Sequence, residues 1–432
     1  MTPSPAQSNA VPLIRADGPP LREFVHRREA VLKQLKSGAG GGSSSAAAGL
    51  IFAGDHTPNL AGKWRPELDF LYLTGLETEP GAAVLFDPSH PDPKRRIGLF
   101  LRPLNPELDR WDGYRDEISS HLRAATGFDY VGRTTHLPMF LRSAARRLKR
   151  LACLHTLATH TGELTPDLSV FRKVSERVPG TTIEDRSMLL AAMRAIKSPA
   201  ELNLMRRAAE ATAAGYKAAM GAIRPGATET TVQRAMELAF IEGGAEGTAY
   251  GSIVGGGINA TVLHYERNSQ VLNEGELLLI DAGAQVGGYA CDVTRTYPVG
   301  GKFTPEQRAL YDMVLKAQLA AIRAARPGKR MHEVDEAART IIDAAGYGDY
   351  FGHGTGHQLG LHVHDAEPDA PLAAGMVITI EPGVYIPELK IGIRIEDDIL
   401  IGRDTPKVLT AEIPKTADDI ERAMSGSTKR GR

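Results

Sequence analysis

The chain has 432 residues, more than one hydrophobic core usually supports, so two domains are expected. Apolar residues make up 42% and charged residues 24%, and the formal net charge is −1, which argues against a dedicated nucleic-acid or membrane-surface binder. The two cysteines, Cys153 and Cys291, suggest no disulfide framework, and no apolar run approaches the ~20 residues that span a bilayer. With no signal-peptide pattern at the N-terminus, these features predict a cytoplasmic protein without a membrane span.

The first domain is expected to cover residues 1–185, beginning with a loose arm at 1–20 that is rich in Pro, Ser and Ala. The next residues, Leu21 to Lys36, carry apolar side chains at helical spacing and predict a helix. Residues 37–49, SGAGGGSSSAAAG, have the composition of a flexible linker but precede the strand-like run LIFAG. We therefore expect a mobile loop inside the first domain.

From Leu50 to about Val170, short β-like runs alternate with helical patterns such as Leu137 to Leu151. This alternation predicts an α/β domain. Within it, the segment Arg65 to Gly75, RPELDFLYLTG, is expected to be a partly exposed strand that leads into a turn.

A boundary near residue 190 separates a second domain, expected at 190–424, from the first, and residues 425–432 are expected to be a disordered tail. Ser198-Pro199-Ala200-Glu201 combines an N-cap, a proline at the first helical position and a glutamate three residues after the cap, so it begins a long amphipathic helix. Thr304-Pro305-Glu306-Gln307 begins another helix in the same way. The order of hairpin, helices and further strands indicates an α+β domain and not a doubly wound one.

The segment Glu276 to Val299 is typical of a β-hairpin, with two β-like runs on either side of Val286-Gly287-Gly288. If Val286 and Gly287 form the loop, Asp281 lies directly opposite Asp292. Opposed side chains have Cβ atoms roughly 4.5–5.5 Å apart, where like charges repel, so a positive partner is required. Two bridged metal ions would meet this need and form a hydrolytic centre. The alternative is a shifted register in which one aspartate is only a turn acceptor.

The segment Phe351 to Asp365, FGHGTGHQLGLHVHD, holds four histidines among four glycines that oppose a helix. His353 and His357 are therefore not the zinc pair of an HExxH helix, whose glutamate is also missing. In an extended chain they lie about 13 Å apart, so at most one of them can bind a given metal ion. The spacing leaves open which histidine this is.

Two further β-like runs carry carboxylates: Val377 to Gly383 includes Glu381, and Gly392 to Ile399 includes Glu396. Successive side chains of a strand point to opposite faces, which puts Arg394, Glu396 and Asp398 on one face of the second run. Glu396 could form a surface ion pair with Arg394. However, both runs are strongly apolar, which favours carboxylates that point into a packed site.

In order along the chain, the motifs RPELDFLYLTG, IKSPAE, LHYERN, DAGAQVGGYACDVTRT, HGTGHQLGLHVHD, ITIEPGVY, GIRIEDD and IPK resemble those of the pita-bread metallopeptidases. Within that group they resemble the aminopeptidase P (Xaa-Pro aminopeptidase) family, over nearly the whole chain. The resemblance implies an α+β protein of two domains, an N-terminal α/β creatinase-like domain and a C-terminal pita-bread domain. It also implies a metallopeptidase that releases the first residue of peptides with proline second.

Residue by residue, the resemblance implies a centre of two divalent ions, Mn²⁺ with Zn²⁺ or Co²⁺ as alternatives, in which Asp292 and Glu396 bridge both ions. The complete implied ligand set is Asp281, Asp292, His357, Glu381 and Glu396. A hydroxide between the ions would attack the peptide, and Glu381 would take and return its proton.

The same resemblance assigns the remaining site residues. His364 would stabilise the oxyanion, and Arg394 would orient the bridging carboxylate. His264, His353 and Tyr385 would face the substrate proline. The first domain, which has no identifiable catalytic residue, would mediate assembly into a homodimer or homotetramer.

Three other functions are compatible with parts of this pattern. A prolidase would use the same metals on dipeptides only, although RPELDFLYLTG favours aminopeptidase P. A methionine aminopeptidase usually lacks so large an N-terminal domain. A non-catalytic binding protein could reuse the fold, but such proteins typically lose the metal ligands, and all five are present here.

Overall fold

The computed structural model describes residues 13–37, 46–55, 64–112, 115–156, 162–365 and 367–427. These residues divide into two compact units, the first ending at Met193 and the second beginning at Arg194, within helix α7 (Met188–Ala195). Most of the expected N-terminal arm and of the expected loop at 37–49 lies outside the described residues. In the described part of the chain, no helix is long and apolar enough to cross a bilayer.

The first unit is built on a mixed six-stranded sheet with the strand order β4-β3-β2-β1-β5-β6. Its strands are β1 (Ala48–Phe52), β2 (Ala83–Phe86), β3 (Ile97–Leu101), β4 (Tyr130–Arg133), β5 (Arg150–Cys153) and β6 (Thr182–Asp185). Its other helices are α1 (Leu21–Ser37), α2 (Leu68–Thr74), α3 (Pro106–Asp112), α4 (Ser120–Thr126), α5 (Leu137–Leu148) and α6 (Pro166–Arg177). The α/β architecture predicted for this domain is confirmed.

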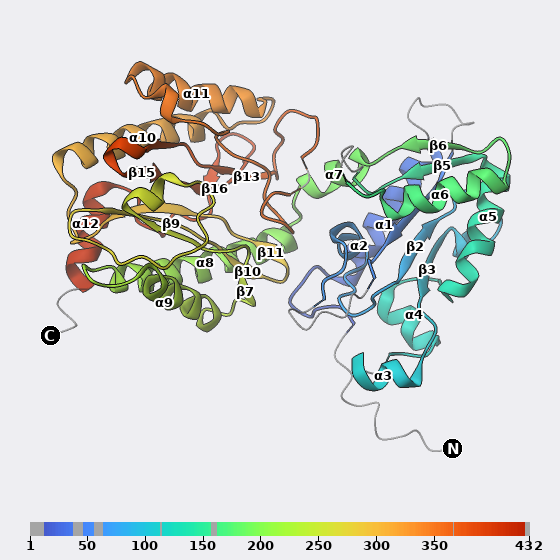
Figure 1. Cartoon of the computed structure of the whole chain (residues 1–432). Coiled ribbons are helices and arrows are strands. Elements are labelled where there is room, and N and C mark those ends of the chain that lie inside the picture. The colour runs from blue at the N-terminus through green and yellow to red at the C-terminus, as the bar shows by residue number, and fades with distance from the viewer. Residues whose placement is uncertain are drawn as a thin grey trace. The chain divides into compact units, whose positions relative to one another are not determined.

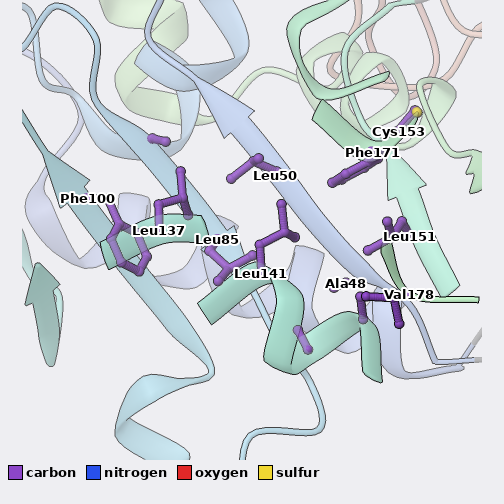
Figure 2. Close-up of a cluster of buried hydrophobic side chains, with 13 residues drawn as sticks. Ala48, Leu50, Leu85, Phe100, Leu137, Leu141, Leu151, Cys153, Phe171 and Val178 are labelled. Atoms are coloured by element: carbon purple, nitrogen blue, oxygen red, sulfur yellow. The ribbon is translucent and has the colours of Figure 1, made fainter. Parts of the chain in front are cut away.

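The core of the first unit lies between the sheet and helices α5 and α6 (Figure 2). Leu50 of β1, Leu85 of β2 and Phe100 of β3 contribute from the sheet, and each is at most 2% exposed. Leu141 of α5 and Phe171 of α6 contribute from the helices. Burial of side chains this large stabilises the fold by roughly 1.5–3 kcal/mol each, so this cluster anchors the sheet.

The prediction of a strand at RPELDFLYLTG is wrong, because most of this segment forms helix α2. Phe70, Leu73 and Thr74 are fully buried on one helical face. Gly75 ends the helix in the left-handed conformation, with φ 69°, and its N–H donates to the Leu71 carbonyl. A short apolar run suits either structure, and here packing decides in favour of the helix. The helix expected at Leu137 to Leu151 likewise ends early, because Lys149 is left-handed with φ 55°.

The second unit places its strands between two helix pairs, α8 with α9 and α10 with α11 (Figure 1). Its helices are α8 (Pro199–Ala222), α9 (Glu229–Glu242), α10 (Pro305–Ala324), α11 (Met331–Ala344) and α12 (Ala417–Ser427). Its strands are β7 (Gly247–Thr248), β8 (Ile253–Gly256), β9 (Leu277–Asp281), β10 (Ala284–Val286), β11 (Tyr289–Ala290), β12 (Thr294–Pro298), β13 (Val377–Ile380), β14 (Gly383–Ile386), β15 (Ile391–Arg394), β16 (Asp397–Leu400) and β17 (Lys407–Val408). The predicted α+β pattern is confirmed.

Both predicted helix starts are capping boxes. The Glu201 N–H donates to the Ser198 hydroxyl at 3.2 Å, and the Ser198 N–H donates to the Glu201 carboxylate at 2.7 Å. Thr304 and Gln307 make the equivalent pair at the start of α10. At the other end of the unit, α12 continues to Ser427, so the first three residues of the expected disordered tail are helical. Residues 428–432 lie outside the described residues.

Candidate metal centre

The central hairpin does not have the predicted register. Its turn is Gly287-Gly288, with φ values of 60° and 82°, which is the two-residue turn that suits the twist of paired strands. Asp281 therefore pairs with Thr294 and does not lie opposite Asp292. The prediction failed because Gly287 and Gly288 can both adopt positive φ, whereas the β-branched Val286 cannot do so without strain. The register is shifted, as in the alternative, but neither aspartate is only a turn acceptor, because both line the cavity described below.

The two aspartates nevertheless converge on one hydroxyl group. Tyr250 lies between β7 and β8, and its hydroxyl is 2.5 Å from Asp281 Oδ1 and also contacts Asp292 Oδ1. Burial raises the pKa of Tyr250 well above its ordinary value, and the two carboxylates raise it further. The hydroxyl therefore stays protonated, and its single O–H proton is shared between these two carboxylates.

Three more candidate ligands meet the aspartates. Atoms of Asp292, His357 and Glu396 that could bind a metal all lie within 4.8 Å of one another. His357 Nε2 is 3.5 Å from Asp292 Oδ2 and 3.5 Å from Glu381 Oε1. Four carboxylates and one imidazole from separate segments are thus gathered at one point.

Thr294 holds the Glu396 side chain in this cluster. Its hydroxyl donates to Glu396 Oε2 at 2.6 Å, and its carbonyl accepts from the Glu396 N–H at 3.0 Å. Arg394 donates through Nε to the same hydroxyl at 3.0 Å and through Nη2 to Asp281 Oδ2 at 2.5 Å. Arg394 and Glu396 are 3% and 2% exposed, so a surface ion pair between them is excluded.

The imidazole of His357 is held in the form that can bind a metal. Its Nδ1 lies 3.1 Å from the Gln358 carbonyl, so the ring proton belongs on Nδ1, and the lone pair of Nε2 points to the carboxylates. Burial lowers the pKa of His357 to about 4, which keeps the ring neutral near pH 7.

The charge balance of the cluster favours a bound cation. Burial raises the pKa values of Asp292 and Glu396 well above their ordinary range, and neighbouring carboxylates raise them further. Burial likewise raises the pKa of Glu381 to about 8. Arg394 contributes one positive charge against four carboxylates. A mostly oxygen donor set with one neutral imidazole suits Mn²⁺ and several other divalent ions, so the residues fit the implied metal centre.

The predicted histidines surround the same centre. His264, His353 and His364 line a cavity of about 460 Å³ together with the candidate ligands. The rings of His364 and His357 have centroids 4.2 Å apart. The hydroxyl of Tyr385 is 2.7 Å from His353 Nε2 and accepts from Arg394 Nη1 at 2.8 Å. All ten site residues named from the sequence thus lie in or beside one cavity.

Two residues of the centre escaped the sequence analysis. Tyr250 comes from a short segment without a recognisable motif, so only the fold could reveal its contacts with Asp281 and Asp292. Thr294 could have been found, because it lies two residues after Asp292 in the hairpin. Asp398, which accepts from the Asp292 N–H at 3.3 Å, lies on the face that alternation predicted.

Comparison with protein families and solved structures gives matches to both units. The family described as Metallopeptidase family M24 matches residues 203–403, and the Aminopeptidase P, N-terminal domain, matches residues 24–152. The chain is 36% identical to a Xaa-Pro aminopeptidase of Haemophilus influenzae, over 94% of this chain and 98% of that one. It is 32% identical to a Xaa-Pro aminopeptidase of Escherichia coli, again over 94% and 98%.

Two solved structures are similar over almost their whole length. Aminopeptidase P from Escherichia coli with the inhibitor Pro-Leu gives a TM-score of 0.81 at 32% identity, covering 95% of this chain and 100% of that one. Aminopeptidase PepP from Pseudomonas aeruginosa gives a TM-score of 0.82 at 30% identity, covering 95% and 99%.

Proposed function

This chain belongs to the aminopeptidase P family of the M24 metallopeptidases, and from that premise we propose how its cavity selects and cleaves a peptide. The protein is a metal-dependent exopeptidase that releases the first residue of peptides with proline in second position. The observation that carries this function is the convergence of four carboxylates and a neutral imidazole in a cavity lined by three further histidines.

Two divalent ions would be held by the candidate ligands described above, which are Asp281, Asp292, His357, Glu381 and Glu396. Such ions lower the pKa of water and polarise the scissile carbonyl. We propose Mn²⁺ as the native metal, with Zn²⁺ and Co²⁺ as alternatives, because hard oxygen donors dominate the set.

Three side chains would carry out the remaining steps of the reaction, which are proton transfer, stabilisation of the oxyanion and orientation of a metal ligand. Glu381, with Oε1 3.5 Å from His357 Nε2, would take a proton from the attacking water and return it to the leaving nitrogen. His364, beside His357, would donate a hydrogen bond to the oxygen of the scissile carbonyl as negative charge develops there. Arg394, expected to orient a bridging carboxylate, bonds Asp281 directly at 2.5 Å and reaches Glu396 only through the Thr294 hydroxyl, so it would orient Asp281 first.

A pocket that accepts the proline ring would give the enzyme its preference for proline in second position. The proline nitrogen in a peptide bond carries no hydrogen, and the proline ring has a fixed shape. A site for proline therefore needs a cavity that matches the ring and no hydrogen-bond acceptor at the position of the nitrogen. His353, Tyr385 and Arg394 form a hydrogen-bonded chain that would make one side of this pocket, and His264, which lines the same cavity, would make another.

The test is a comparison of kcat/KM for Xaa-Pro-Yaa peptides, an Xaa-Pro dipeptide and an Xaa-Ala-Yaa control, because this ratio reports differential transition-state binding. We expect efficient release of the first residue from the proline peptides longer than two. Hydrolysis of the dipeptide alone would establish a prolidase instead. Equal rates on the alanine control would refute the proline pocket.

We further propose a homodimer or homotetramer in the cytoplasm. The first unit carries none of the ten site residues, which leaves assembly as its role. Cys153 and Cys291 are both buried and free, as suits a reducing compartment. Sedimentation of the metal-loaded protein as a monomer at micromolar concentration would contradict the assembly.

A further inference from the structure

One wall of the cavity is formed by a loop between the short 3₁₀ turn at Gly257–Thr261 and Gln270. Leu263, His264 and Glu266 of this loop line the cavity. The mechanism uses His264 alone, so Glu266 is a charged group at the site without an assigned role.

The loop is held at both ends by one buried carboxylate, that of Glu229 in the first turn of α9, which is 0% exposed. Its Oε1 accepts from the Gly256 N–H at 2.8 Å and from Asn259 Nδ2 at 3.0 Å. Its Oε2 accepts from the Tyr265 hydroxyl at 2.9 Å and from the Gln270 N–H at 2.8 Å. Charge-assisted bonds of this kind are strong, and four of them from one residue fix the loop.

Asn268 fixes the other side of Glu266. It has a left-handed backbone, with φ 46°, and is 2% exposed. Its side chain donates to the Ser252 carbonyl at 2.7 Å and accepts from the Val254 N–H at 2.9 Å. Because Tyr265 and Asn268 are both anchored, the backbone of Glu266 is held in a defined position on the cavity wall.

The carboxylate of Glu266 is exposed to the cavity and has no ion pair or hydrogen bond with any described residue. The carboxylate lies over Gly251: if Gly251 carried a Cβ atom, that atom would be 3.6 Å from Glu266 Oε1. Gly251 follows Tyr250, whose hydroxyl contacts Asp281 and Asp292. Glu266 is therefore beside the segment whose Tyr250 contacts the two aspartates.

We propose that Glu266 makes the enzyme prefer substrates whose first residue has a cationic side chain, lysine or arginine, over those whose first residue is acidic. This inference rests on the proposed function, in which the first residue of the substrate must lie beside the metal ligands because its own carbonyl is attacked. Divalent ions would offset the four ligand carboxylates, but Glu266 is not among the ligands. Its charge remains to select an opposite charge on the substrate.

The test measures kcat/KM of the Mn²⁺-loaded enzyme on Arg-Pro-Ala, Gln-Pro-Ala and Glu-Pro-Ala. A partly exposed ion pair contributes up to about a fivefold preference, so arginine should exceed glutamine by about fivefold, with glutamate lowest. Glu266→Gln should remove the preference, and Glu266→Lys should reverse it. Glu242→Gln is the matched control, since Glu242 is exposed at the end of α9 outside the cavity lining and should leave the preference unchanged.

A wild-type enzyme with equal kcat/KM on the arginine and glutamate peptides would overturn the proposal, as would a preference that survives in Glu266→Gln. If no proline peptide is cleaved at all, the proposed function fails instead. Calorimetric binding of Arg-Pro-Ala and Glu-Pro-Ala to the wild type and to Glu266→Gln then decides the role of Glu266 on its own. Equal affinities of both peptides for the wild type would refute that role.

Discussion

Replacement of Tyr250 by phenylalanine should weaken metal binding without unfolding the protein. The hydroxyl of Tyr250 is 2.5 Å from Asp281 Oδ1 and also contacts Asp292 Oδ1. Its removal leaves two mutually repelling carboxylates without this shared donor. A hydrogen bond to a charged group contributes about 1.5–3 kcal/mol, and loss of a residue that orients metal ligands typically lowers metal affinity by about 10- to 100-fold.

The measurement is calorimetric titration of the metal-stripped wild type and Tyr250→Phe with Mn²⁺. We expect the variant to bind Mn²⁺ about 10- to 100-fold more weakly. Its kcat/KM should fall most at limiting Mn²⁺ and recover in part at high Mn²⁺, because the ligands themselves are unchanged.

Tyr216→Phe is the matched control for this experiment. The hydroxyl of Tyr216 is fully buried beside the same hairpin, but it contacts backbone carbonyls of Ile280, at 3.2 Å, and Val293 instead of carboxylates. Its loss should lower the free energy of unfolding by about 1 kcal/mol and leave the affinity for Mn²⁺ unchanged. An unchanged affinity in Tyr250→Phe, or an equal loss in both variants, would refute the reasoning.

Three further outcomes are expected. Chelator treatment of the wild type should abolish turnover, and so should Asp292→Ala or Glu396→Ala, while circular dichroism still reports a folded chain. Full activity after metal removal would contradict a metal centre. Lys415→Met should lower the free energy of unfolding by about 1.5–3 kcal/mol in denaturant titration. The buried carboxylate of Asp397 loses one cation at 2.7 Å and keeps its pair with Arg295, also at 2.7 Å; an unchanged midpoint would show that the Lys415 pair contributes nothing. Burial raises the pKa of Glu79 to about 7, so its contribution to stability is full below about pH 4 and is lost as pH rises to 7. Glu79→Gln should therefore raise the melting temperature at pH 8 and leave it nearly unchanged at pH 4, and the opposite pH dependence would contradict the assigned sign.

Several features of the fold followed from the sequence because they are local. The capping boxes at Ser198 and Thr304 depend on residues three positions apart, and both are present. The hairpin was also predictable, since a Gly-Gly pair between two β-like runs favours a tight turn. Its register was not, because the choice between Val286-Gly287 and Gly287-Gly288 moves every cross-strand pair.

The types of residue that form the centre could be predicted from the sequence. Carboxylates at the ends of apolar strands indicated a metal centre, and the resemblance to a family assigned His357 among the four histidines of its segment. The spacing of the histidines alone left that choice open. In the structure, the burial of His357 and its contact with the Gln358 carbonyl give the physical reason for a neutral ligand.

Other features depended on tertiary structure alone. RPELDFLYLTG carries a pattern that fits a strand or a helix, and burial of Phe70 and Leu73 on one helical face selects the helix. Tyr250 joins Asp281 and Asp292 although it comes from a separate segment. The sequence by itself determines local backbone preferences and the supply of ionisable side chains, because these depend on near neighbours. Which charges meet, and which side chain stands between them, is decided only when distant segments pack together and exclude water.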